Sequence, residues 1–248
     1  MVFFVGPVPE NSTLVSLEPE DAAHVSRVLR MRPGQDIMVY DSAENRLSCV
    51  LEDVGKGHVT ARILTREPAG NEPSVAVTVY AGLSKGDRFE YLIQKCVECG
   101  VRHIVPFVSR FCVAVPKAGD YDKKRERFAR IALEAAKQSG RSRPPTVGNI
   151  LTLDAVLQEA AGADLGLFLW EKENQMGLSR RLNAEHGAKT YAIVTGPEGG
   201  FATEEWASAH EAGLHSVSIG PRILRCETAP VAALCAIMYH TGNFDIGE

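Results

Sequence analysis

The chain has 248 residues, of which 45% are hydrophobic and 23% are charged, so its composition indicates a soluble globular protein and excludes a largely disordered one. No run of eighteen apolar residues occurs, and the amino terminus has neither a basic start nor a cleavable hydrophobic stretch, so we expect a cytoplasmic protein without a membrane partner. The net charge of −4 excludes a protein that coats nucleic acid indiscriminately, but it leaves room for RNA binding through local basic patches.

Residues 1–72 are expected to form a first domain that consists mostly of β-strands. Four strand-like segments, VFFVG, QDIMVYD, RLSCVLEDV and HVTARILTRE, are separated by turn residues. One short helix interrupts them, beginning near Pro19 and ending near Leu29. This pattern favours a small β-barrel, and the proline-containing polar segment EPAGNEPS (67–74) is expected to be the linker that follows it.

Residues 73–248 are expected to form a second, α/β domain, because strands and helices alternate from Val75 onward. Apolar strands such as VAVTVYAGL, LGLFLW and TYAIVTG predict a parallel sheet covered by helices on both faces. The helices are expected near 87–99, 121–139, 153–161, 176–185, 203–212 and 229–241. The last helix is almost wholly apolar, so it should be buried.

The six cysteines are scattered through apolar runs, so we expect reduced and mostly buried thiols. Cys96 and Cys99 have the spacing of half a zinc site, but no second half follows, and no metal is expected. Trp170 and Trp206 are assigned to packing by default.

A glycine-rich turn follows the predicted strand TYAIVT, where the sequence reads GPEGGF at 196–201. Glycines let a ligand approach the backbone closely, and ligands of open α/β sheets bind beyond the carboxyl ends of strands. Thr203 and the two acids after it are expected to cap the next helix. The spacing is neither that of a dinucleotide fingerprint nor that of a P-loop. From the glycines alone, a tight turn that merely connects strand to helix is an equal alternative.

A second loop follows the predicted strand HSVSIG and places Arg222, Arg225 and Glu227 within six residues, just before the apolar final helix. Charges at the mouth of a buried helix are costly unless they face a ligand or pair with each other. The sequence therefore favours a ligand site here, with a simple ion pair between Arg225 and Glu227 as the alternative.

These segments resemble the SPOUT superfamily of RNA methyltransferases and, within it, the RsmE family of ribosomal small-subunit uridine N3-methyltransferases. The resemblance covers nearly the whole chain and is specific through the order of its motifs, each of which is weak alone. They are HVSRVLR at 24–30, KGD at 85–87, QK at 94–95, ECGV at 98–101, IALEAAKQSGR at 131–141, GPEGGF at 196–201, GPRILR at 220–225 and ETA at 227–229. The departures are Cys226, where the family tends to have threonine, and Ile219 and Cys99, where it tends to have leucine.

The resemblance implies a PUA-like RNA-binding barrel, followed by an α/β domain whose carboxyl-terminal chain threads a trefoil knot, in a homodimer. It implies S-adenosylmethionine as the methyl donor and 16S ribosomal RNA, in the maturing small ribosomal subunit, as the substrate. The cofactor residues implied are Leu169, Trp170, Glu171, Thr195, Gly196, Pro197, Glu198, Gly199, Gly200, Ile219, Gly220, Leu224, Cys226, Thr228 and Ala229.

Methylation at N3 requires that the uridine imide lose its proton before it attacks. A nearby cation favours the ionised form, so we hypothesise that Arg225, together with Arg222, stabilises the uridinate. Glu227 or Glu198 is expected to take the proton, with water as the alternative acceptor. The target base must be unpaired or flipped out of its helix.

Two groups of basic residues are candidates for the RNA contact. The first lies on the helix near 121–139, where Phe128 and its apolar neighbours form a separate stripe, and the second lies on the first domain's helix and the turn after it. The proposed RNA-binding residues are Arg27, Arg30, Arg32, Lys123, Lys124, Arg127, Arg130, Lys137 and Arg141. For the long helix taken alone, a merely solvated charged surface is the stronger alternative.

Three other functions fit parts of the pattern. An RNA-binding or ribosome-assembly module without catalysis would need the basic surfaces but neither the glycine turn nor the arginine loop. A different SPOUT reaction, such as ribose 2′-O methylation, would share the cofactor fold. A nucleotide-dependent oxidoreductase is disfavoured, because the dinucleotide fingerprint is missing.

Overall fold

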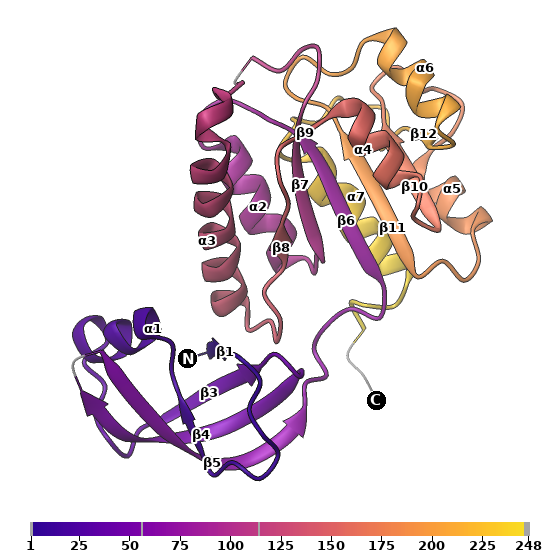
Figure 1. The fold of residues 1–248 in the computed structure, drawn as a ribbon. Helices are drawn as coiled ribbons and strands as arrows, with labels where there is room; N and C mark the ends of the chain where they lie inside the picture. Colours follow the sequence, from indigo (N-terminus) through magenta and orange to yellow (C-terminus); the bar gives the residue numbers. More distant parts are fainter. Residues whose placement is uncertain (1, 56, 114, 246–248) are drawn as a thin grey trace. The chain divides into compact units, whose positions relative to one another are not determined.

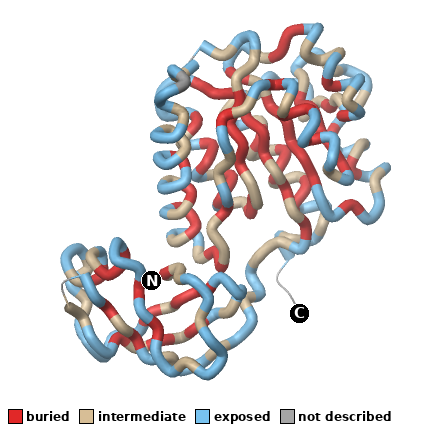
Figure 2. Tube along the Cα trace, in the orientation of Figure 1, coloured by how far each residue is buried: buried red, intermediate tan, exposed pale blue. Residues whose placement is uncertain are grey.

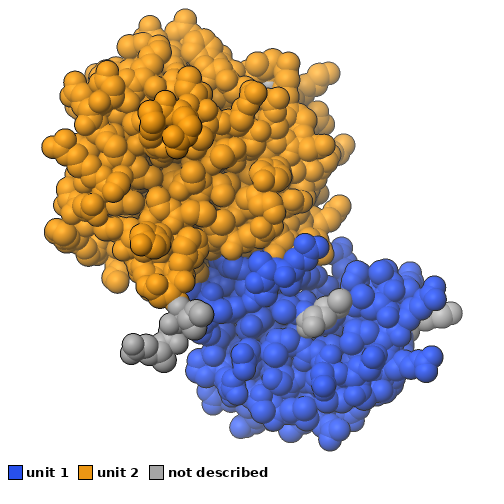
Figure 3. Space-filling model, turned by 180° about the vertical axis from the view of Figure 1, so that it is seen from behind, with its two compact units in different colours: residues 1–72, 136–144 blue, residues 73–135, 145–248 orange. Residues whose placement is uncertain are grey.

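A computed structural model describes residues 2–55, 57–113 and 115–245 of the chain and divides it into two compact units. Unit 1 consists of residues 1–72 together with 136–144, and unit 2 consists of residues 73–135 and 145–248 (Figure 3). The domains expected from the sequence, residues 1–72 and 73–248, stay a prediction, and the compact units differ from them in that residues 136–144 belong to unit 1.

Unit 1 is built on a five-stranded curled sheet with strand order β1-β3-β4-β5-β2 (Figure 1). The strands are β1 (Val2–Val5), β2 (Leu14–Ser16), β3 (Asp36–Asp41), β4 (Asn45–Gly55) and β5 (His58–Pro68). β1 pairs with β3 in parallel, and the other pairs are antiparallel. β2 was not predicted, because three residues are too few to show an alternating pattern.

The helix of unit 1 begins with Pro19, as its sequence predicts, and changes its hydrogen-bonding pattern half-way along. α1 (Pro19–Ala23) continues directly as a π-helical turn, η1 (His24–Val28). Arg30, which follows, has a φ of 51°, a left-handed conformation that is unusual for a residue with a side chain. Ala22 and Val25 are fully buried against the sheet, so the helix closes one side of the core of unit 1.

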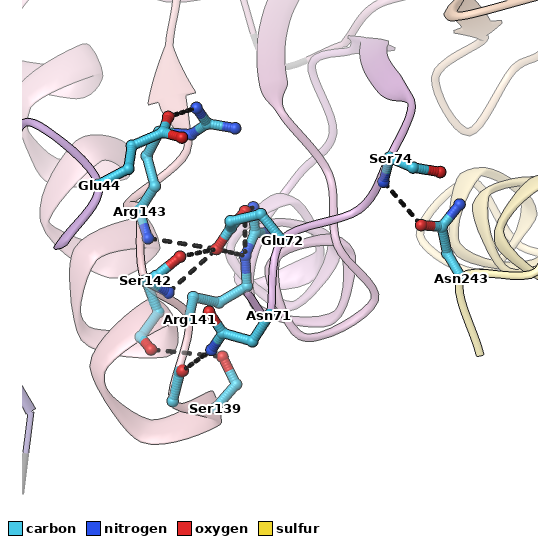
Figure 4. Close-up of polar contacts among 11 residues, drawn as sticks. Glu44, Asn71, Glu72, Ser74, Ser139, Arg141, Ser142, Arg143 and Asn243 are labelled. Carbon is cyan, nitrogen blue, oxygen red and sulfur yellow. Dashed lines mark hydrogen bonds and ion pairs between the residues drawn. The ribbon is translucent and has the colours of Figure 1, made fainter. Parts of the chain in front are cut away.

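The expected linker is held in place at Glu72. This carboxylate accepts hydrogen bonds from the Arg141 side chain, from the Ser142 N–H and hydroxyl and from the Arg143 N–H, at 2.5–3.3 Å (Figure 4). The side chains of Glu72 and Arg141 are only 11% and 6% exposed. The segment around Glu72 is therefore a fixed part of unit 1 rather than a loose connection.

Unit 2 contains the predicted parallel sheet, in which every paired strand runs in the same direction. Its order is β12-β10-β11-β6-β7-β8, with β9 also paired to β7. The strands are β6 (Ala76–Gly82), β7 (His103–Val108), β8 (Thr146–Val147), β9 (Leu151–Thr152), β10 (Leu165–Leu169), β11 (Thr190–Thr195) and β12 (His215–Val217). The central strands are almost wholly buried, as their apolar sequences predict (Figure 2).

Helices cover both faces of this sheet. They are α2 (Arg88–Glu98), α3 (Tyr121–Ser139), α4 (Leu153–Ala160), α5 (Leu178–Ala184), α6 (Thr203–Glu211) and α7 (Ala229–His240), with a short 3₁₀ turn, η2 (Ala118–Asp120). α7 packs on β6 and β11 and contacts α2 and α5, while α4 packs on β7 and β11 and contacts α6 (Figure 1). Among the described residues, none of the helices combines the length and the apolar character that spanning a membrane requires.

The final helix was expected to be buried, but α7 is buried on one face only. Its inward face is buried, but Tyr239 is 78% exposed, and the residues between are only partly covered. The buried residues are Pro230, Ala233, Leu234, Ile237 and Met238. A helix that is apolar on every side gives no indication of which face the sheet will cover, so the sequence could not distinguish the covered face from the exposed one.

Candidate active site

Three strand ends meet at one edge of the sheet of unit 2. Leu169, the last residue of β10, lies in register with Thr195 of β11 and with Val217 of β12. The loops that follow these strands therefore leave the sheet side by side, and they enclose a cavity of about 300 Å³. The glycine-rich loop and the arginine-bearing loop, predicted from separate motifs, thus form one site.

Nearly all the residues expected at the cofactor line this cavity. They are Leu169, Trp170, Glu171, Thr195, Gly196, Pro197, Glu198, Gly199, Gly200, Ile219, Gly220, Leu224, Cys226 and Ala229. The three expected catalytic residues, Arg222, Arg225 and Glu227, line it as well. Thr228 is not part of the lining and instead stands at the start of α7, where its N–H donates to the Arg225 carbonyl at 2.8 Å.

The turn at 196–200 needs its glycines because other chain segments pass very close to it. A Cβ at Gly200, where φ is +67°, would lie 2.9 Å from Glu171 Oε1. A Cβ at Gly82, the last residue of β6, would lie 2.6 Å from the Pro197 nitrogen. The Gly200 N–H donates to the Pro197 carbonyl at 2.9 Å, which closes the turn. The glycines are therefore required for packing as well as for access to the cavity.

The helix after this turn is not capped by Thr203, so that prediction is wrong. The N-cap residue is Ala202, and Thr203 is already the first helical residue. The carboxylate of Glu205 does the capping instead, since it accepts the Ala202 N–H at 2.8 Å. This bond is the half of a capping box in which the acid at the third helical position accepts the N–H of the N-cap residue, while alanine at the N-cap offers no side-chain acceptor for the first turn.

Glu198 is held at the cavity by two donors. Its Oε1 accepts the Lys85 N–H at 2.8 Å and the Arg88 guanidinium at 3.1 Å. Burial acts to raise the pKa of Glu198, but these bonds outweigh it and leave the pKa below its ordinary value. Arg88, at the start of α2, lines the cavity and was missed, because a charged residue that begins an amphipathic helix normally faces solvent.

Cys226 and Glu227 form a hydrogen-bonded pair in the arginine loop. The Cys226 thiol donates to Glu227 Oε2 at 3.2 Å, and burial, followed by this carboxylate, raises the pKa of Cys226 to about 12. The thiol is therefore neutral at physiological pH. Across the described residues, no ion pair joins Arg225 to Glu227, so the structure removes the alternative of a simple ion pair at this helix start.

Trp170 and Trp206 stack on each other at 4.8 Å between ring centroids, with Trp170 in the cavity wall. Both rings also pack against the core of unit 2, as the sequence predicted. Of the six cysteines, two are buried and four are half-buried, so the thiols are less enclosed than expected. Among the described residues, no three His, Cys, Asp or Glu side chains are grouped so that they could hold a metal ion.

The basic residues of unit 1 surround an open hollow. Arg27, Arg30 and Arg32 are exposed there, and the wall is completed by the end of β4. On α3, Lys123, Arg127 and Arg130 are exposed and lie apart from the buried stripe that contains Phe128. Arg127 pairs with Glu90 at 2.6 Å, and the Lys124 Nζ lies 5.7 Å from the centre of the Phe128 ring.

Two predicted RNA-binding residues need correction. Lys137 pairs with Asp21 at 2.5 Å, with side chains 17% and 12% exposed, and Arg141 is buried beside Glu72. Neither side chain presents an open charge on an exposed stripe. Helical periodicity placed them with Arg127 and Arg130, but their partners lie more than sixty residues away in the sequence and leave no local signal.

The curled domain, the parallel sheet and the cavity at its strand ends together define a two-domain RNA methyltransferase. Residues 71–238 match the RNA methyltransferase domain family, and residues 17–64 match the RNA methyltransferase PUA domain family. More narrowly, the chain belongs to the ribosomal RNA small subunit methyltransferase E family, the RsmE family that its motifs resemble.

Three relatives illustrate the likeness. The chain is 32% identical over 236 residues to ribosomal RNA small subunit methyltransferase E of Bacillus subtilis, which covers 94% of this chain and 92% of the relative. It is 32% identical over 252 residues to the protein of that name from Mycobacterium tuberculosis, covering 99% and 94%. The crystal structure of ribosomal RNA small subunit methyltransferase E from Neisseria gonorrhoeae, bound to S-adenosyl methionine, has a TM-score of 0.85 at 30% identity and covers 96% of both chains.

Proposed function

We propose that this protein transfers a methyl group from S-adenosylmethionine to N3 of a specific uridine in 16S ribosomal RNA, during maturation of the small ribosomal subunit. The observation that carries the proposal is the cavity itself, in which a glycine-rich wall, three arginines and three glutamates converge at neighbouring strand ends. The family to which the chain belongs supports the same reaction, and so does the S-adenosyl methionine bound to the Neisseria relative.

The residues present fit this cofactor. The turn at 196–200 is built so that the backbone forms the wall, which leaves room for a flat purine ring to approach closely. Glu171, Glu198 and Glu227 supply negative charge to a donor whose sulfonium is positive. When bound, the cofactor supplies an activated methyl group, and the enzyme chiefly has to align it with the attacking nitrogen, an effect that can lower a barrier by about 7 to 11 kcal/mol.

Arg225 and Arg222 are proposed to stabilise the uridine after N3 has lost its proton. Both are exposed at the cavity, and neither has an ion-pair partner among the described residues, so their charge is available to a substrate. A guanidinium close to the imide lowers the cost of forming the anion, because an opposite charge favours the ionised form. Arg88 is less suited, since it is already paired with Glu198.

Glu227 is a better proton acceptor than Glu198. The Glu198 carboxylate is committed to the Lys85 N–H and to Arg88, and its lowered pKa makes it a weak base. Glu227 receives only the weak S–H donor of Cys226 from its immediate neighbour and stands in the same loop as Arg225. We assign the proton to Glu227, either directly or through one water molecule.

The proposal extends to the partners. RNA would contact the exposed arginines of unit 1, Arg27, Arg30 and Arg32, and the cations on the outer side of α3, Lys123, Lys124, Arg127 and Arg130. The partly covered face of α7, which ends in the exposed Tyr239, would be the homodimer contact. We further propose that the carboxyl-terminal chain threads the knot that the resemblance implies and that the protein acts in the cytoplasm.

Mass spectrometry of ribosomal RNA from cells with and without the gene tests the reaction, because it distinguishes a base methyl from a ribose methyl. We expect 3-methyluridine to disappear, whereas loss of a 2′-O-methyl group would replace this proposal by the other SPOUT reaction.

The Arg225→Ala enzyme should keep its cofactor affinity but lose about 100-fold or more in turnover. Arg180→Ala, an exposed arginine on α5, is the matched control. Absence of cofactor binding by calorimetry in the wild type would favour a non-catalytic RNA-binding module.

A further inference from the structure

A short turn after β7 presents an aromatic ring to solvent at the cavity's edge of the sheet. The Cys112 N–H donates to the Ser109 carbonyl at 3.1 Å, which places Arg110 and Phe111 at the corner of the turn. Phe111 is 41% exposed, whereas Phe107 in the preceding strand is fully buried. Because all strands of this sheet are parallel, the turn leaves from the same edge as the loops that enclose the cavity.

The turn is held from two directions. The Arg110 N–H donates to Glu205 Oε1 at 2.9 Å, and the Arg110 guanidinium meets Glu204 at 3.4 Å, so the turn is tied to the start of α6. The Cys112 sulfur accepts the Ser109 N–H at 3.4 Å within the turn, and its thiol donates to the Phe107 carbonyl at 3.8 Å, which ties the turn to β7. A turn anchored in this way presents Phe111 in a defined position instead of leaving it on an unrestrained loop.

Phe111 also lies directly against the cavity wall. A Cβ built on Gly199 would lie 2.7 Å from the Phe111 Cβ, and Gly199 itself lines the cavity. On the arginine loop, Ile223 lines the same cavity and is 86% exposed, between Arg222 and Arg225. The cavity thus has an exposed aromatic ring beside one wall and an exposed aliphatic side chain on another, with arginines next to both.

We propose that Phe111 is the surface on which the target uridine base stacks when it is brought to the cavity, with Ile223 as a second apolar contact. This inference rests on the proposed function, since it takes an unpaired pyrimidine as the substrate. Proteins that bind unpaired RNA stack bases on aromatic side chains and place arginines along the backbone. Phe111, with Arg110 beside it and Arg222 on the arginine loop, offers the same pairing of an aromatic ring with arginines. Neither packing of the core nor the contact with α6 requires an exposed ring at position 111.

The test uses the full-length protein and small ribosomal subunits isolated from cells that lack the gene. In Phe111→Ala we expect kcat/KM for the subunits to fall about 10- to 100-fold, mainly through KM, with cofactor affinity unchanged. Phe111→Trp should restore stacking and activity, whereas Phe111→Leu, which keeps an apolar side chain, should not. Val113→Ala is the matched control, because Val113 is 63% exposed in the same loop.

A second measurement separates stacking from structural support and does not depend on catalysis. Short oligouridylate should bind the wild type more tightly than a phosphodiester of equal length that lacks bases, and Phe111→Ala should abolish the difference. Equal binding of both chains to the wild type would overturn the proposal, and so would full activity in Phe111→Leu. If the wild type transfers no methyl group at all, the proposed function fails, while the oligouridylate comparison still decides whether Phe111 binds bases.

Discussion

Removal of the Glu72 carboxylate is expected to destabilise unit 1 far more than removal of an exposed carboxylate. Glu72 accepts bonds from the Arg141 side chain, from Ser142 and from the Arg143 N–H (Figure 4). Both Glu72 and Arg141 are nearly buried. Glu72→Ala therefore takes this acceptor away from a buried guanidinium and from two backbone N–H groups at once.

The magnitude follows from burial. Breaking a buried ion pair by deleting one partner costs about 3 to 5 kcal/mol. The matched control is Glu67→Ala, because Glu67 pairs with Arg46 at 2.9 Å with side chains 53% and 46% exposed. Exposed pairs contribute about 0.2 to 1 kcal/mol. We expect the free energy of unfolding of unit 1 to fall by about 3 to 5 kcal/mol in the first variant and by less than about 1 kcal/mol in the second.

Amide hydrogen exchange in β4 and β5 measures this difference, because the two strands pair along most of their length within unit 1. Trp170 and Trp206 belong to unit 2, so tryptophan fluorescence would follow the wrong part of the chain. Protection in Glu72→Ala should fall by about 100-fold or more. Similar protection in the Glu72→Ala and Glu67→Ala proteins would refute the argument, and complete loss of structure in unit 1 of Glu72→Ala alone would support it.

Three further predictions concern the site and the RNA surface. Gly82→Ala forces a Cβ to within 2.6 Å of the Pro197 nitrogen, so cofactor binding measured by calorimetry should weaken by about 1 to 3 kcal/mol while the far-UV circular dichroism spectrum stays unchanged. The pKa of Cys226, about 12, keeps its thiol neutral at pH 8, so its alkylation by iodoacetamide, measured by mass spectrometry, should be slow at that pH and should accelerate as the pH rises. Alkylation should be faster in Glu227→Gln, because this variant removes one cause of the raised pKa. Arg30→Ala should reduce the slope of log affinity for RNA against log salt concentration by about 0.7 to 0.9, the effect of one phosphate contact, and an unchanged slope would exclude that contact.

Much of the fold could be predicted because its signals are local. The helices of unit 2 begin and end within two residues of their expected bounds, and the apolar runs of β10 and β11 indicated a sheet covered on both faces. What was missed has no local pattern. β2 is three residues long, and the covered face of α7 depends on where the sheet lies.

Of the candidate site, too, the parts with a local sequence signal could be predicted and the others could not. The turn at 196–200 and the loop with Arg222 and Arg225 could be predicted, since glycines and charges stand out where a buried strand ends. Arg88 and Phe111 could not, because each comes from another part of the chain, and only the order of the strands brings Arg88 into the cavity lining and Phe111 against Gly199 of its wall. The same limitation explains the error at Arg141, whose partner Glu72 lies sixty-nine residues away.

Because unit 1 combines two separate segments of the chain, it has a consequence for folding during synthesis. Residues 136–144 carry Lys137 and Arg141, which neutralise Asp21 and Glu72. A nascent chain that has emerged only as far as residue 72 holds two carboxylates without these cations and cannot complete the unit. Unit 1 therefore lacks part of its residues until 136–144 have emerged from the ribosome, by which time α2 and α3 have emerged as well. Residues 1–72 are therefore not expected to fold to completion before residues 136–144 are available. A gene fusion that carried residues 1–72 alone would lack this part of the domain.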